Sequence, residues 1–153
     1  MAGEKDSQQT TVLERLRELL VQQCERLQNY LIILDNQQNS IESAQTDDLL
    51  AYVDLEEQII TDIFSIQKVI DPLEDMYREY PASPDDILSL KASLEGLKRQ
   101  AIAQSSRNRE LLSARMAAIR AEIDILRKNP ISVSARRSVY QNFNTASLVD
   151  IKG

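Results

Sequence analysis

The sequence predicts an all-α fold of three long antiparallel helices, which form a coiled-coil-like bundle or hairpin and are followed by a non-helical C-terminal tail. Apolar residues recur every three or four positions over long stretches, which is the spacing of a helix with one buried face. Only three glycines and four prolines occur in 153 residues, and long uninterrupted helices require that scarcity. We expect a helical bundle over residues 1–129 and a flexible basic tail over residues 130–153.

The first helix is expected over about residues 8–44, and Ser7 or Thr10 is expected to cap its N-terminus. Its heptad positions are Leu13, Leu20, Leu27, Leu34 and Ile41, and the positions between them are Leu16, Cys24, Leu31 and Gln38. Apolar residues at this spacing are typical of a helix that packs along its length against another helix.

The second helix is expected over about residues 47–79, after the segment AQTDDLLAY interrupts the heptad spacing. Thr46 is the expected N-cap, and Asp47 and Asp48 occupy the first turn, where the helix dipole favours carboxylates. Pro72 falls inside this helix, and an interior proline removes one hydrogen bond and kinks or ends the helix. We favour a kink, because the apolar pattern continues beyond the proline.

The third helix is expected over about residues 84–128. Ser83 is the expected N-cap, Pro84 takes the first helical position, and Asp85 and Asp86 lie in the first turn. Its apolar residues form an early group, Ile87, Leu90, Leu94, Leu97 and Ala101, and a late group, Leu112, Met116, Ile119, Ile123 and Leu126.

Polar residues separate the two apolar groups of the third helix. Gln104, Ser105 and Asn108 take positions where leucine would continue the pattern. One interpretation is a polar layer inside a bundle, which fixes the register of the helices. The other is an opening in the core, where a partner begins. If the late group extends beyond the cover of the other helices, it forms an exposed apolar strip, which usually marks a binding surface.

The charge is unevenly distributed along the chain. Residues 127–153 hold five basic side chains and one acidic one, whereas the remaining 126 residues hold 13 basic and 23 acidic ones. An acidic body argues against nucleic acid as a partner, because binding to phosphate needs a basic surface. The basic tail would suit an acidic protein surface, either on a partner or on the body of this chain.

The residues needed for most enzyme and metal chemistry are missing. The chain contains no histidine and a single cysteine, Cys24, so neither a histidine base nor a thiolate zinc site is expected. Its three glycines lie far apart, which excludes a glycine-rich phosphate loop. No signal sequence is recognisable, and the longest apolar run is YLIIL. We expect a cytoplasmic protein without catalytic activity, cofactor, metal or membrane insertion.

Four features together resemble the FlgN-type flagellar export chaperones, which are small acidic helical proteins of bacteria. They are the heptad-patterned first helix, the phrase TDDLLAYVDLEEQI at the start of the second, SSRNRELL in the third, and SVYQNFN in the tail. The resemblance covers about residues 10–145. The family's tails often place glycine near the tyrosine, whereas this chain has glutamine and asparagine there.

The resemblance implies a protein that binds the C-terminal helical segments of flagellar hook-associated (hook-filament junction) proteins. Such a chaperone prevents premature assembly of its clients and delivers them to the flagellar type III export apparatus. The client-binding residues implied in this chain are Asn108, Leu111, Leu112, Met116, Ile119, Ile123 and Leu126. Tyr140 and Phe143 are the residues implied to dock at the export gate.

A structural coiled-coil protein that acts by self-assembly is the alternative hypothesis. The strict heptad spacing of the first helix favours it, whereas the proline breaks and the polar segment of the third helix disfavour one long rod. The chaperone hypothesis predicts a monomer or weak homodimer with an exposed strip. The coiled-coil hypothesis predicts a stable oligomer that covers that strip.

Overall fold

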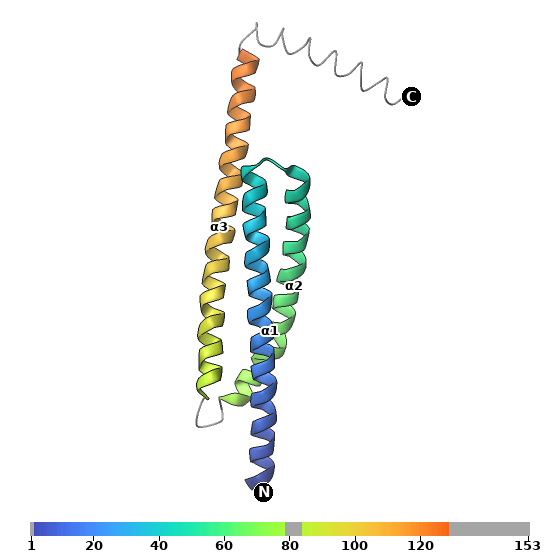
Figure 1. Ribbon diagram of the computed structural model, residues 1–153, viewed down its shortest axis with the longest axis vertical. Helices are drawn as coiled ribbons and strands as arrows, with labels where there is room; N and C mark the ends of the chain where they lie inside the picture. Colours follow the sequence, from blue (N-terminus) through green and yellow to red (C-terminus); the bar gives the residue numbers. More distant parts are fainter. Residues whose placement is uncertain (1, 79–83, 129–153) are drawn as a thin grey trace, which may run out of the picture. The chain divides into compact units, whose positions relative to one another are not determined.

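The computed structural model describes residues 2–78 and 84–128, and this part of the chain consists of three long α-helices. They are α1 (Ala2–Glu42), α2 (Thr46–Tyr77) and α3 (Asp85–Lys128) (Figure 1). The prediction of an all-α fold with three long helices is therefore confirmed. The tail over residues 130–153 lies outside the described residues, as does the expected N-cap Ser83.

The chain divides into two units within α3, one of residues Met1–Leu111 and one of residues Leu112–Gly153. In the first unit α1 lies between α2 and the N-terminal part of α3 (Figure 1). Contacts of α1 with α2 run in opposite residue order, from Gln23 with Ile63 to Gln37 with Tyr52. Contacts of α1 with α3 run in the same order, so α2 is antiparallel to both of the other helices.

A continuous apolar core joins the three helices of the first unit. Leucines at heptad positions of α1 form its spine, as the sequence predicts, and α2 and α3 each add fewer side chains. The fully or nearly fully buried members are Leu16, Leu19, Leu20, Leu27, Leu34, Ile70, Tyr77, Ile87, Leu94 and Ala101. Because α1 contributes apolar residues towards both neighbours, it is the helix on which the other two pack.

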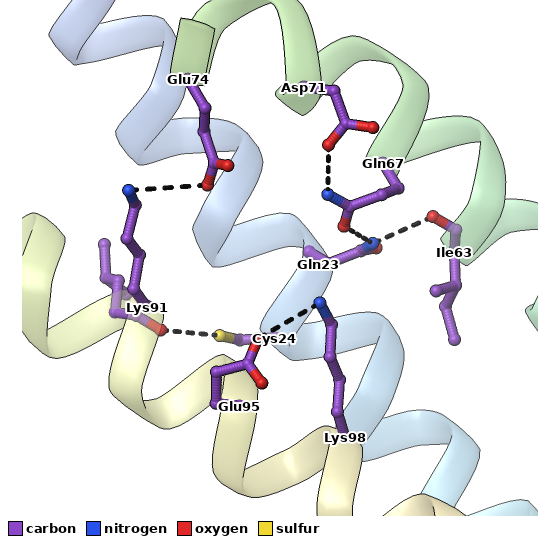
Figure 2. Close-up of polar contacts among 10 residues, drawn as sticks. Gln23, Cys24, Ile63, Gln67, Asp71, Glu74, Lys91, Glu95 and Lys98 are labelled. Carbon is purple, nitrogen blue, oxygen red and sulfur yellow. Dashed lines mark hydrogen bonds and ion pairs between the residues drawn. The ribbon is translucent and has the colours of Figure 1, made fainter. Parts of the chain in front are cut away.

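Polar contacts cross between the helices beside this core (Figure 2). The side-chain amide of Gln23, which is fully buried, donates to the carbonyl oxygen of Ile63 at 2.9 Å and to Gln67 at 3.2 Å. Lys91 of α3 lies 3.7 Å from a carboxylate oxygen of Glu74 in α2. These contacts fix the relative register of the helices, because a shift by one turn would separate every pair.

The helix ends differ from the sequence-based expectations. The first helix begins at Ala2 rather than near residue 8, and the hydroxyl of Thr10 donates to the carbonyl oxygen of Asp6 within the helix at 2.8 Å. The predicted cap at Ser7 or Thr10 was therefore wrong. In α2 the N-cap position is Gln45, without a side-chain cap bond, and Thr46 is the first helical residue.

The expected acidic first turns are confirmed, whereas α3 begins at Asp85, so the expectation of Pro84 at its first helical position was wrong. Asp47 and Asp48 lie in the first turn of α2, and Asp85 and Asp86 lie in the first turn of α3. Pro72 lies inside α2, which continues through it to Tyr77, so the proline does not end the helix. A helix tolerates an interior proline where tertiary packing outweighs the lost hydrogen bond.

Candidate functional site

A layer of hydrogen-bonded polar side chains crosses the first unit where the sequence interrupts its apolar pattern. Asn108 of α3 is buried, and its amide donates to the carbonyl oxygen of Leu34 at 2.8 Å and to Gln37 at 3.3 Å. Gln104 donates to Asn108 at 2.9 Å and to Gln38 at 2.8 Å. The polar segment of α3 is thus a layer inside the bundle, which is the first of the two interpretations above.

The same layer continues into α2 through Glu56. The hydroxyl of Tyr30 donates to one carboxylate oxygen of Glu56 at 2.8 Å, and the amide of Gln37 donates to the other. Partial burial and the neighbouring carboxylate raise the pKa of Tyr30 to about 12, because both disfavour a charged phenolate. Polar atoms of all three helices are therefore linked in one network.

These hydrogen bonds show that Asn108 is a buried residue of the bundle and not part of an exposed surface. The side chain lies inside the bundle and its amide is engaged by α1, so it does not belong to an exposed client-binding surface. Its physical role in the described structure is to hold α3 in register with α1.

An apolar groove lies beside the polar layer, between α2 and α3, with α1 as its floor. It has a volume of about 480 Å³. Its lining is mostly apolar and includes Leu27, Tyr30, Ile60, Phe64, Ala101 and Ile102. Phe64 is 64% exposed and Ile102 is 71% exposed, so the bundle leaves two large apolar side chains uncovered at the rims of the groove.

A second apolar surface lies on the part of α3 that belongs to the second unit. Four large side chains are spaced by four, three and four residues, which places them on one face of the helix. They are Leu112, Met116, Ile119 and Ile123, with exposed fractions of 37, 46, 51 and 42% respectively. We call these four residues the α3 strip. At 1.5 Å per residue the strip is about 17 Å long.

Six of the sequence-predicted site residues therefore lie on the surface or at its edge. The four residues of the α3 strip are exposed, and Leu111 and Leu126 are half-buried. Tyr140 and Phe143 lie outside the described residues, so their predicted role at the export gate stays a prediction.

Sequence reasoning missed the groove. Neither Phe64 nor Ile102 is singled out by the pattern of its own helix. A usable signal was present at Ile102, because it follows Ala101 directly and widens the apolar face of α3 beyond one stripe. Whether such a widened face is covered depends on the distance between α2 and α3, which the pattern of one helix does not determine.

The described residues show neither a cluster of three possible metal ligands nor a helix apolar and long enough to cross a membrane. An uncharacterized protein of Treponema pallidum (strain Nichols) is 30% identical to this chain over 127 residues, which make up 83% of this chain and 82% of that protein. No protein-family model matches the sequence. No solved structure matches it either.

Proposed function

We propose that this protein is a cytoplasmic export chaperone of the FlgN type. It belongs to the same family as the uncharacterized Treponema pallidum protein. In this proposal it binds the C-terminal helical segments of flagellar hook-associated proteins, prevents their premature assembly and delivers them to the type III export apparatus. The α3 strip is the client-binding surface, with Leu111 and Leu126 at its edges. The protein acts by binding and carries out no catalysis.

The observation that carries this proposal is the exposure of the α3 strip. Four large apolar side chains on one helical face, each more than a third exposed, favour burial against a partner. Their spacing matches that of an amphipathic helix, which would dock its own apolar face along the strip. Met116 suits such a surface, because its flexible side chain adapts to different client residues.

Release of the client is compatible with such a surface. A client segment that becomes helical only on binding loses conformational entropy, which lowers the net affinity. A strip about 17 Å long also buries far less area than a permanent interface. Both effects favour micromolar rather than nanomolar binding, which a carrier that must hand over its client requires.

The test is calorimetric titration of the full chain with C-terminal peptides from the hook-associated proteins of the same organism. The test variant carries Ile119→Glu and Ile123→Glu within the strip. The matched control carries Ala114→Glu and Ala121→Glu, because these exposed alanines lie on the opposite face of the same helical segment. The control adds the same charge to the same segment of α3.

We expect micromolar binding by the natural chain and by the control, and a loss of at least about tenfold in the strip variant, since burial of each isoleucine contributes about 2 kcal/mol. Circular dichroism should show that all three proteins remain helical. If the natural chain binds none of the peptides, the chaperone proposal is wrong.

Self-assembly through the α3 strip is the alternative, and the exposure of the strip supports it equally. Sedimentation separates the two, because self-assembly gives a stable oligomer that the strip variant converts to a monomer. The chaperone proposal expects a monomer or a weak homodimer in both proteins.

Docking at the export gate forms a separate part of the proposal. We expect Tyr140→Ala with Phe143→Ala to leave client binding unchanged and to weaken co-purification with the export apparatus, since aromatic anchors commonly dominate low-affinity contacts. An equal loss of both activities would show that the two aromatic residues act in client binding instead.

A further inference from the structure

The groove between α2 and α3 combines an apolar interior with cationic ends. Lys98 and Arg109 line it together with the apolar residues, and none of its described lining residues is acidic. The two cations are eleven residues apart on α3, which corresponds to about 17 Å along the helix axis. This distribution stands out in a chain of net charge −6.

The partners of the two cations leave the positive charge of the groove largely in place. The nearest carboxylate oxygen to Lys98 Nζ belongs to Glu95, one turn earlier on α3, at 3.5 Å (Figure 2). The side chain of Glu95 is 65% exposed, and solvent weakens such a pair. Arg109 contacts the uncharged hydroxyl of Ser105 at 3.4 Å.

We propose that this groove binds one amphipathic helix of a partner protein, whose apolar face enters the groove and whose flanking residues are acidic. The carboxylates would pair with Lys98 at one end and Arg109 at the other. The apolar side chains would cover Phe64 and Ile102, which the bundle leaves exposed. This site is separate from the α3 strip and does not depend on the partner's being a flagellar protein.

A helix fits this groove better than an extended peptide does. The lining is mostly apolar and offers few groups that would pair with the free amides and carbonyls of an extended chain. A helix satisfies these groups internally and presents only side chains. About 11 residues of helix, or three turns, span the distance between the two cations.

The test uses two synthetic helical peptides of about 15 residues, a length that just suffices for helix formation with strong helix formers. Both carry leucines on one face, and the flanking positions are glutamate in one peptide and lysine in the other. Fluorescence anisotropy with the full chain measures both affinities at low and high salt. We expect the glutamate peptide to bind at least about tenfold more tightly at low salt, and salt to reduce this ratio.

Three variants locate the binding. Ile102→Glu places a charge at the apolar rim and should weaken the glutamate peptide at least about tenfold. Lys98→Glu with Arg109→Glu should reverse the preference, so that the lysine peptide binds more tightly. The control Ile32→Glu lies on α1 outside the groove lining, at a side chain that is 60% exposed, and should bind like the natural chain.

The outcomes also separate this proposal from the proposed function. The variant with Ile119→Glu and Ile123→Glu should retain the glutamate peptide, because the α3 strip is not involved. Equal affinity for the two peptides, or unchanged binding in Ile102→Glu, would overturn the groove proposal and leave the α3 strip untouched. A homodimer that Phe64→Glu dissociates would also overturn it, since a second copy of the chain would then occupy the groove.

Discussion

Ala44 closes α1 in a backbone conformation that alanine rarely adopts. Its φ is 56°, in the left-handed region. The amide of Ala44 donates to the carbonyl oxygen of Ile41 at 3.3 Å, and the amide of Gln45 donates to that of Ser40 at 3.0 Å. These two bonds form a Schellman motif, in which the left-handed position usually holds glycine. Alanine at this position stores backbone strain, because its Cβ crowds the neighbouring carbonyl.

Replacing Ala44 by glycine should therefore stabilise the protein. We expect Ala44→Gly to raise the free energy of unfolding by about 1 kcal/mol, measured by urea denaturation. The control is Ala51→Gly at an exposed interior position of α2, which should lower it by about the same amount. Destabilisation by both variants would show that Ala44 is not strained in solution.

Tyr30 makes stability depend on pH at the alkaline end. Its pKa rises from 10.0 to about 12, so the folded state holds the phenol proton more tightly than the unfolded state does. This contribution is fully present below pH 10 and is lost as the pH rises from about 10 to about 12. We expect Tyr30→Phe to lose less stability than the natural chain over this range, measured by urea denaturation at each pH. Parallel curves for the two proteins would contradict the raised pKa.

At the scale of a helix, the fraction of apolar residues that become buried differs between the helices. The heptad residues Leu20, Leu27, Leu34 and Ile41 of α1 are buried. In contrast, α2 buries few of its apolar residues and leaves Phe64 exposed. The reason is position: α1 lies between two neighbours, and α2 packs on one side only. The first described residues of α1 are helical although their side chains are exposed, so packing on the other helices does not hold this segment.

Gly96 is a weak point in α3. It lies in the helix interior, and a Cβ added to it would meet no atom within 4 Å. Gly96→Ala should therefore raise the free energy of unfolding by about 1 kcal/mol, through lower entropy of the unfolded chain and better helix propensity. Gly3→Ala provides the control, because Gly3 lies in the first turn of α1, where helices fray. The thermal midpoint should rise for Gly96→Ala and change little for Gly3→Ala.

At the scale of the whole molecule, the two units differ in how much they bury. In α3 the described buried residues are Ile87, Leu94, Ala101, Ser105 and Asn108, all of which belong to the first unit. The described residues of the second unit are exposed apart from the half-buried Leu126. The helical segment of the second unit is therefore stabilised mainly by its own backbone hydrogen bonds.

Hydrogen exchange should reveal this difference within one helix. Amides of residues 112–128 should exchange orders of magnitude faster than those of residues 90–108, because opening the former exposes no buried apolar core. Addition of a client peptide that binds the α3 strip should slow exchange in residues 112–128. Equal protection of both segments in the free protein would show that another molecule or a second copy covers the strip.

The sequence alone determined much of this molecule. Heptad leucines, the scarcity of glycine and proline, and the acidic first turns specify three helices, because these signals act within one helix or between adjacent turns. The exposed side chains of the α3 strip were also expected from the sequence, as an alternative to internal packing. The start of α1, the start of α2 and the left-handed end at Ala44 were not recovered. The N-cap position of α2 is glutamine and the left-handed position after α1 is alanine, and neither residue is usual there.

Only the tertiary structure decided which residues are buried and which are exposed where the pattern of a single helix allows either. The sequence left Asn108 either inside a layer or at an opening, and its bonds to Leu34 and Gln37, more than 70 positions away, place it inside. The groove likewise depends on three helices at once, because α1 forms its floor and the separation of α2 and α3 leaves Phe64 and Ile102 uncovered. Residue patterns report which face of a helix is apolar, whereas burial depends on what distant segments bring to that face.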